Sequence, residues 1–300
     1  YGIADSDYLS LPRNQLSKGN SFIFSILSYI EIAYGLLTGT RLHLSAEQVT
    51  QDLYNFYGNP NLNDLSINLY CKEHRDQNAN SGDPLCTLAY IQQKGIMSEY
   101  DFPYQEGKGE NKYDPKLVMP VNVTDISSIA IQKESDEKYK LVQITDPVNP
   151  LLTGTYDQIF LRISFRMQSW FTDVKQDQIT PITAYVCSSL LKDADKIIDT
   201  VDENCEPDQL VAITALGYMV SNTNIFYAEI INSNGIDSGL DGKFYLKITD
   251  GKGIAINNGK IFSRLTFFRV KHDPDMPFKI SNAYDECPKC EIEFPDKRKK

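Results

Sequence analysis

The sequence predicts an α+β fold, because helical and strand-like patterns occupy different parts of the chain. Residues 21–37 are apolar on nearly all faces, which is typical of a helix in the middle of a domain, and Asn20 and Ser21 are candidate N-caps at its start. Amphipathic helices are expected at 42–53, where Ser45 supplies an N-cap, and at 85–94, where Gly95 ends the pattern. The clearest strand patterns follow residue 180, at 181–186, 209–218, 225–231, 243–248 and 261–270.

The segment 105–180 between these two parts gives a weaker signal. It has strand-like patches within 116–131, a predicted loop at 145–149 around Pro147, and a helical pattern at 156–174. With 300 residues the chain is long enough for a large core, either as one fold or as two lobes that share an interface.

Charge and hydropathy exclude some classes of partner. The formal net charge of −10 argues against nucleic acid, which needs a basic face, and the basic run at 297–300 reads as a solvated tail. The most apolar stretch is interrupted by Glu31 and several serines and is short for a bilayer, so we expect a buried helix and no membrane span. Nothing in the pattern indicates a cofactor.

Three separated runs share a family pattern. Around the start of the apolar helix, Gln15, Gly19, Phe24 and Ser25 fit the motif Gln-Gly-x-Cys-Gly-Ser-Cys-Trp-Ala-Phe-Ser, with Ser21 at the second cysteine. The run at 90–104 fits Tyr-Ile-x-x-x-Gly-Ile-x-x-Glu-x-x-Tyr-Pro-Tyr, and the run at 227–235 fits Tyr-Trp-x-x-x-Asn-Ser-Trp-Gly without its tryptophans. In this order the runs resemble the papain-like (cathepsin-type) cysteine peptidases.

The resemblance covers residues 14–270 and implies one papain-like domain at 1–270 followed by a C-terminal extension at 271–300. Within that domain it implies a helical left lobe, mainly 14–104, an enlarged inter-lobe segment, 105–180, and an antiparallel, β-barrel-like right lobe, mainly 181–270. The enlarged segment is similar to that of the serine-repeat antigens, some of which also have serine at the nucleophile position.

The resemblance also assigns the catalytic positions, and two of them are changed. Ser21 takes the place of the nucleophilic cysteine and Val211 the place of the histidine, whereas Gln15 matches the oxyanion-hole glutamine and Asn232 the orienting asparagine. A serine hydroxyl without a base is a poor nucleophile. The chain's histidines, which all lie elsewhere, are His43, His74 and His272. We therefore expect an inactive homologue with no functional catalytic residue.

A remnant of the peptide groove is predicted from the same comparison. Ser81 and Gly82 match the backbone ledge that holds a substrate peptide, and Pro84 matches a proline in the pocket for the peptide's second residue. Tyr185 stands at the base of that pocket, where the family has a small residue. The hypothesis is that Tyr185 partly fills the pocket and that the groove cannot take a peptide in the usual way.

Six cysteines, an even number, favour disulfides if the protein is exported. The family's left-lobe bridges use positions that are here Lys18, Leu53 and Ala79, so other pairings are expected. By comparison with the family we expect Cys71 to pair with Cys86 and Cys187 with Cys205. The remaining CxxC, Cys287 and Cys290, is expected to form a short-loop disulfide or a cross-link to the body, and no metal site is expected because no second ligand pair accompanies it.

Asn122-Val-Thr124 is a candidate glycosylation site and gives slight support for a secretory route. The expected location is therefore secreted or lumenal: the secretory pathway, a lysosome- or vacuole-like compartment, or the extracellular space.

The leading functional hypothesis is a pseudopeptidase that acts through protein binding, as a decoy, competitor or regulator of active relatives. The alternative is a structural subunit of a larger assembly, in which 105–180 and the tail supply the contact surfaces. A weak serine-dependent hydrolase is a third reading, disfavoured by the missing general base.

Overall fold

The computed structural model describes residues 13–39, 41–77, 81–105, 114–155, 158–159, 178–179, 182–187, 197–198, 210–223, 225–235, 237, 239–247 and 264–271. For some strand positions, including 182–187, only the backbone is described. The expected helix at 156–174, apart from 158–159, and the extension beyond residue 271 lie outside the described residues.

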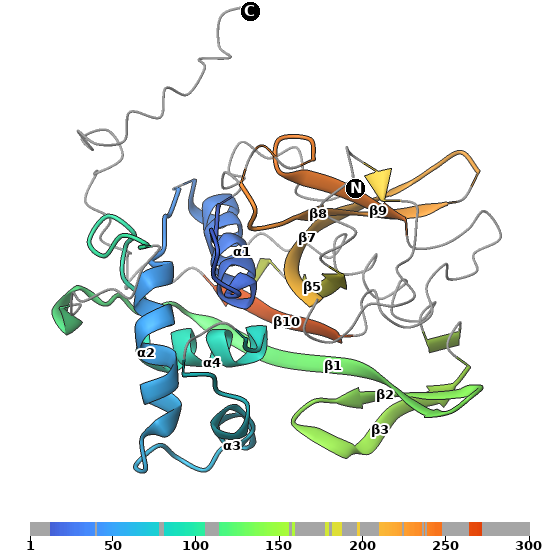
Figure 1. Cartoon of the computed structure of the whole chain (residues 1–300), viewed down its shortest axis with the longest axis horizontal. Helices are drawn as coiled ribbons and strands as arrows, with labels where there is room; N and C mark the ends of the chain where they lie inside the picture. The colour runs from blue at the N-terminus through green and yellow to red at the C-terminus, as the bar shows by residue number, and fades with distance from the viewer. Residues whose placement is uncertain are drawn as a thin grey trace, which may run out of the picture.

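The helices come early in the chain, as the sequence predicts, and gather on one side of the molecule (Figure 1). They are α1 (Ser21–Thr38), α2 (Ala46–Gly58), α3 (Ser66–Glu73), α4 (Pro84–Lys94) and the short 3-10 helix η1 (Pro115–Leu117). Ser45 is the N-cap of α2 as predicted, and its hydroxyl accepts a hydrogen bond from Gln48 N at 3.1 Å. Gly39 and Gly95 follow the last residues of α1 and α4.

The cap expected at the start of α1 is different. Asn20 occupies the N-cap position but its side chain makes no capping hydrogen bond. Instead its Nδ2 donates to Tyr104 Oη at 3.0 Å and to Thr50 Oγ1 at 3.2 Å. Because Asn20 is completely buried, these tertiary partners replace the local cap.

The strands form one sheet in the order β3-β2-β1-β10-β5-β7-β8-β9-β6, with β4 beside β10. Their bounds are β1 (Val123–Ser135), β2 (Lys138–Gln143), β3 (Asp146–Gly154), β4 (Gln178–Ile179), β5 (Ile182–Cys187), β6 (Ile197–Ile198), β7 (Leu210–Val220), β8 (Phe226–Ile231), β9 (Lys243–Lys247) and β10 (Arg264–Lys271). All described pairs are antiparallel except β6 with β9. The segment between the lobes thus enters the same sheet through the pairing of β1 with β10.

The loop predicted at 145–149 is wrong, because these residues run into the edge strand β3. Pro147 and Pro150 gave the turn signal. A proline has no backbone N–H, and an edge strand tolerates it because one side of the strand needs no partner. Nearly every residue of β3 is exposed, in keeping with its place at the edge of the sheet.

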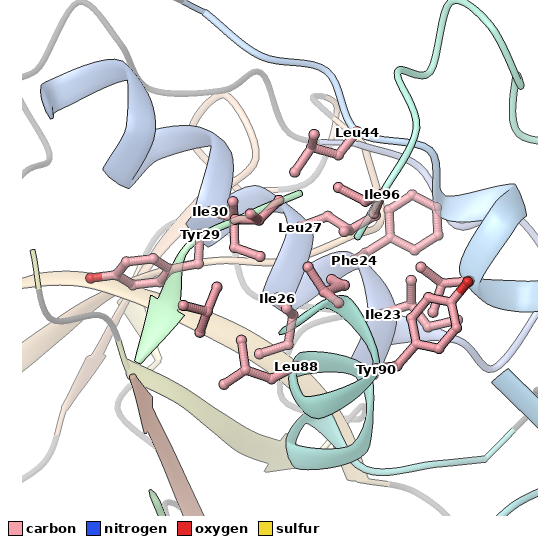
Figure 2. Packing of buried hydrophobic residues seen from close by; sticks show 14 of the residues in the cluster. Ile23, Phe24, Ile26, Leu27, Tyr29, Ile30, Leu44, Leu88, Tyr90 and Ile96 are labelled. Atoms are coloured by element: carbon pink, nitrogen blue, oxygen red, sulfur yellow. The ribbon is translucent and has the colours of Figure 1, made fainter. Parts of the chain in front are cut away.

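Helix α1 lies between the other helices and the sheet and forms the centre of the core (Figures 1 and 2). Tyr29 meets Phe268 of β10 edge-on, with ring centroids 5.6 Å apart. From β7, Thr214 Oγ1 donates to the carbonyl oxygen of Ser25 at 2.7 Å. Ile26 of α1 and Leu88 of α4 are buried in the same core.

By length and composition α1 is the one helix in the described part of the chain that could cross a membrane. In this structure 83% of that stretch is buried inside the protein. Its apolar character is therefore accounted for by the core that surrounds it, as the sequence analysis expects.

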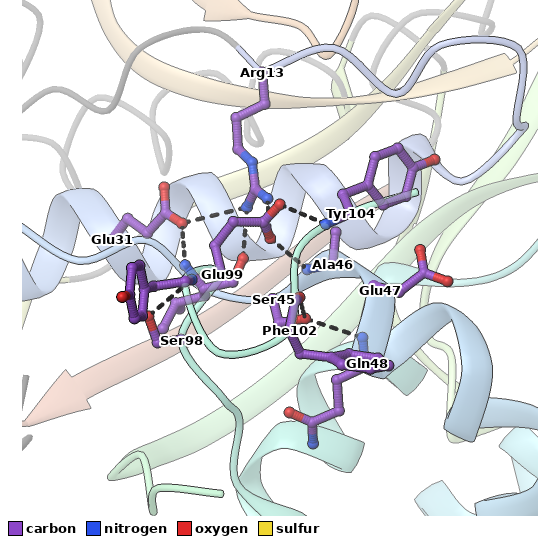
Figure 3. A network of polar contacts seen from close by, with 12 residues as sticks. Arg13, Glu31, Ser45, Ala46, Glu47, Gln48, Ser98, Glu99, Phe102 and Tyr104 are labelled. Atoms are coloured by element: carbon purple, nitrogen blue, oxygen red, sulfur yellow. Dashed lines mark hydrogen bonds and ion pairs between the residues drawn. The ribbon is translucent and has the colours of Figure 1, made fainter. Parts of the chain in front are cut away.

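A buried ionic network joins the entry to α1 with the helical lobe (Figure 3). The Arg13 guanidinium contacts Glu31 Oε1 at 3.3 Å and Glu99 Oε2 at 2.9 Å. Arg13 also donates to the carbonyl oxygen of Leu44 at 2.8 Å, and the Leu44 N–H donates to Glu31 Oε1 at 2.8 Å. The other oxygen of Glu99 accepts from Tyr104 N at 2.7 Å. One cation thus serves two largely buried carboxylates on separate segments.

Replacing this cation should destabilise the fold strongly. Arg13→Met removes the partner of Glu31, whose side chain is only 1% exposed, and is expected to lower the free energy of unfolding by about 3–5 kcal/mol. Denaturant unfolding followed by circular dichroism measures this change. The matched control is Lys138→Met, which breaks the exposed pair with Glu134 and should leave stability nearly unchanged. Equal losses of stability in the two variants would show that the ionic network around Arg13 does not stabilise the fold.

Candidate functional site

Ser21 is the first residue of α1 and its side chain is turned into the protein. The residue is only 6% exposed, and its Oγ accepts a hydrogen bond from Ala212 N of β7 at 3.1 Å. Among the described residues, no other hydrogen bond to this hydroxyl is recorded. The side chain at the nucleophile position therefore joins the helix to the sheet.

Val211 directly precedes the amide that binds Ser21 and pairs with Val186 of β5. The structure thus brings the residue at the histidine position next to the residue at the nucleophile position, as the sequence comparison expects. An aliphatic side chain neither accepts nor donates a proton, so the neighbour of Ser21 supplies no base.

Asn232 follows β8 and is 5% exposed. Its Oδ1 accepts from Asn234 N at 3.1 Å, and its Nδ2 has no hydrogen-bond partner among the described residues. An asparagine that orients an imidazole would use its oxygen for that purpose, but here the oxygen serves its own loop. A buried amide without a partner is costly, which makes this side chain unusual in the core.

Gln15 lies in the loop before α1, and its side chain is occupied locally. Its Nε2 donates to the carbonyl oxygen of Lys18 at 2.8 Å, and its Oε1 accepts from the hydroxyl of Ser233. Its backbone N–H donates to the carbonyl oxygen of Ser233 at 2.7 Å. An oxyanion-hole donor must point at the reacting oxygen with a free N–H. In this arrangement one of the two side-chain N–H groups is directed at the carbonyl oxygen of Lys18.

The two histidines that the structure describes have local partners. His74 stacks on Tyr70 with ring centroids 4.0 Å apart, and its Nδ1 lies 2.8 Å from the carbonyl oxygen of Tyr70. His43 lies beside the Arg13 network, next to the residue whose N–H binds Glu31, and Glu31 is about 15 Å along α1 from Ser21. His272 lies outside the described residues.

Ser81 and Gly82, the residues predicted to form the ledge, make close contacts with neighbouring segments. The N–H of Ser81 donates to Asp76 Oδ2 at 3.0 Å. A Cβ at Gly82 would lie 2.5 Å from the ring of Phe22, so only glycine fits this position. Pro84 is the first residue of α4 and is buried. The side chain of Tyr185 lies outside the described residues, so its predicted role in filling the pocket stays a prediction.

Comparison with solved structures decides the fold. The bromelain protease from Ananas comosus, in complex with the E64 inhibitor, matches 88% of this chain and 96% of its own, with a TM-score of 0.54 and 17% identity. Procathepsin L 3 from the Tenebrio molitor larval midgut matches 87% of this chain and 66% of its own, with a TM-score of 0.54 and 15% identity. The chain has a papain-like fold.

Similarity in sequence is more limited. Bovine (Bos taurus) pro-cathepsin H is 25% identical over 157 residues, which are 52% of this chain and 41% of pro-cathepsin H. No protein-family model matches the chain. The papain-like fold has therefore been kept while much of the sequence diverged.

The cysteines of this papain-like chain pair differently from the family pattern. Cys71 of α3 and Cys86 of α4 form a disulfide, the pair that the sequence analysis expects. The bridge borders a small, partly open hollow, which Phe22 and Gly82 also line. The predicted pair Cys187–Cys205 and the CxxC of Cys287 and Cys290 lie outside the side chains that the structure describes.

Lys18 stands where the papain-like pattern has a disulfide cysteine, and polar contacts hold its side chain. Its Nζ donates to the carbonyl oxygen of Gln105 at 2.7 Å and lies 3.9 Å from Glu47 Oε2. It also lies 5.0 Å from the ring centroid of Tyr104. The loop before α1 is thus tied to the helical lobe without a covalent bond.

A charged cluster beside the predicted ledge was missed by the sequence analysis. Arg264 Nη2 of β10 forms an ion pair with Asp83 Oδ2 and donates to Tyr70 Oη at 2.8 Å. The Tyr70 hydroxyl in turn donates to Asp83 Oδ2 at 2.7 Å. An arginine at the start of a strand pattern was the available signal, but its partner is 181 residues away in sequence.

Two further predictions concern a glycosylation site and a metal site. Asn122 is partly exposed just before β1, so its candidate glycosylation stays a prediction. In the described part of the chain, no group of three histidine, cysteine or acidic residues is arranged to hold a metal ion.

The histidine near the ionic network should make stability depend on pH. Burial, followed by the charge of Arg13, lowers the pKa of His43 from 6.5 to about 4. Between these values the unfolded chain binds the proton and the folded chain does not, so this group's contribution to stability falls as the pH falls from 6.5 to about 4. Burial raises the pKa of Glu99, which acts in the opposite direction.

The variant His43→Gln measures how much of the pH dependence of stability comes from His43. By pH 4 the variant is expected to have lost less stability than the wild type, by up to about 3 kcal/mol. Chemical unfolding at a series of pH values gives both curves. His74→Gln is the surface control and should follow the wild type. Parallel curves for wild type and His43→Gln would contradict the pKa assigned to His43.

Proposed function

We propose that this chain is a catalytically inactive papain-like protein that acts by binding another protein. The observation that carries the proposal is the state of Ser21, a buried hydroxyl that accepts from the Ala212 amide, next to a valine at the base position. A serine nucleophile needs a base within hydrogen-bond reach, and the described residues around Ser21 offer none.

The other catalytic positions support the same proposal. Gln15 directs one of its two side-chain N–H groups to the carbonyl oxygen of Lys18, and Asn232 directs its oxygen to its own loop. Removal of one member of a catalytic unit already lowers rates by orders of magnitude. A role as decoy, competitor or regulator of active relatives fits a protein that keeps the fold without the chemistry.

The compartment is part of this proposal. The Cys71–Cys86 disulfide favours an oxidising environment, which the secretory pathway, a lysosome- or vacuole-like compartment or the extracellular space would supply. Partner identity is left to experiment, and no cofactor or nucleic acid is included in the proposal.

Covalent labelling tests the loss of catalysis. A small fluorophosphonate probe, which needs an activated serine but no peptide groove, should label neither the wild type nor Ser21→Ala. A serine hydrolase treated in parallel verifies the probe. Labelling of the wild type that disappears in Ser21→Ala would overturn the proposal and require a base near Ser21.

A structural subunit is the second candidate function, and one observation favours it. The hairpin of β2 and β3 presents apolar side chains to solvent: Val148 is 83% exposed, Leu151 53% and Leu152 38%. Exposed apolar side chains gathered on one element often mark a protein contact.

The second candidate predicts association through this hairpin. Light scattering after size-exclusion chromatography should show oligomers that grow with concentration, and Val148→Lys with Leu151→Lys should return the protein to a monomer. Leu65→Lys, at another exposed leucine, is the control and should leave the mass unchanged. A wild-type monomer at all concentrations would exclude self-assembly through this surface.

A further inference from the structure

The ion pair of Arg264 and Asp83 joins β10 to the start of α4. β10 pairs with β5 at Leu265↔Ala184, and one step further along this antiparallel register Arg264 stands opposite Tyr185. The family comparison assigns Tyr185 to the base of the pocket for the peptide's second residue. On that assignment, Arg264 occupies the strand position beside the base of the pocket.

Asp83 belongs to the opposite wall. It lies between Gly82 of the ledge and Pro84 of the pocket, and its Oδ1 accepts from Leu85 N at 2.9 Å as the N-cap of α4. The Asp83 side chain is 4% exposed. The ion pair thus joins the sheet to the helical wall at the level of the ledge.

Tyr70 completes the contact from α3. Its hydroxyl accepts from Arg264 and donates to Asp83, and the guanidinium carbon lies 5.6 Å from its ring centroid. Each polar group of the cluster has a partner, and the Arg264 side chain is only 20% exposed. Separating a buried pair of this kind leaves charges uncompensated, so the cluster resists opening.

We propose that Arg264, Asp83 and Tyr70 form an internal plug that fills the second-residue pocket and excludes an extended peptide from the groove. The cation reaches across the space that a peptide's apolar side chain would occupy, and the aspartate holds it there. A protein partner then binds surfaces outside the groove. The plug depends on the papain-like fold and not on the loss of catalysis. An experiment can therefore refute the plug and leave the proposed inactivity standing, or the reverse.

Peptide binding to plug variants tests this directly. The probe is a dye-labelled tetrapeptide amide with leucine at the position that the pocket receives, followed by fluorescence anisotropy. The double variant Asp83→Asn/Arg264→Ser removes both charges together, and its asparagine can still cap α4. Because a buried leucine side chain contributes strongly to binding, the double variant should bind at least about tenfold more tightly than the wild type.

Two further variants make the result interpretable. Asp83→Asn alone is the milder change and should loosen the plug partly, with intermediate affinity. Arg269→Ser is the matched control, because Arg269 lies on the same strand and its pair with Asp125 is exposed. It should bind the peptide no better than the wild type. Thermal unfolding checks that each variant is folded.

Two results would overturn the proposal. Wild-type protein that binds the peptide as tightly as the double variant would show that the pocket is open. Folded plug variants that still fail to bind would show that another part of the chain excludes the peptide.

Discussion

Two buried carboxylates share a single guanidinium, and the placement of α1 and the helical lobe depends on this contact. Glu31 lies on the central helix and Glu99 on the segment after α4, and Arg13 holds both. The same residue reaches the other lobe, since its carbonyl oxygen accepts from Gly235 N at 3.0 Å. Neither carboxylate could stay charged in the core without this partner. The entry to α1, the helical lobe and the loop after β8 are therefore fixed by one residue.

Several residues aligned with the papain-like motifs make structural contacts. The hydroxyl of Ser21 joins helix to sheet, and the amide of Gln15 closes its own loop. Lys18 replaces a covalent bridge with contacts to a carbonyl oxygen, a carboxylate and an aromatic ring. Together these contacts pack the loop before α1 and the start of α1 against the helical lobe and the sheet.

Sequence patterns over a few residues predicted the helices, but they did not predict contacts between residues that are far apart in the sequence. The apolar run at 21–37, the Ser45 cap and the glycine after α4 are signals written within a few residues, so the helices could be placed. Asn20 was assigned a local cap because its competitors, Thr50 and Tyr104, are distant in sequence. The partner of Arg264 could not be found for the same reason. The prolines of β3 suggested a loop because sequence alone does not say which strand lies at an edge.

Pro147 and Pro150 also affect how the protein would aggregate at high concentration. An exposed edge strand with apolar side chains is a template on which other chains can stack into fibrils. Pro147 and Pro150 deprive β3 of two donors and interrupt the ladder that such growth requires. Contacts made there must rely on side chains, which allows a finite association and opposes endless polymerisation.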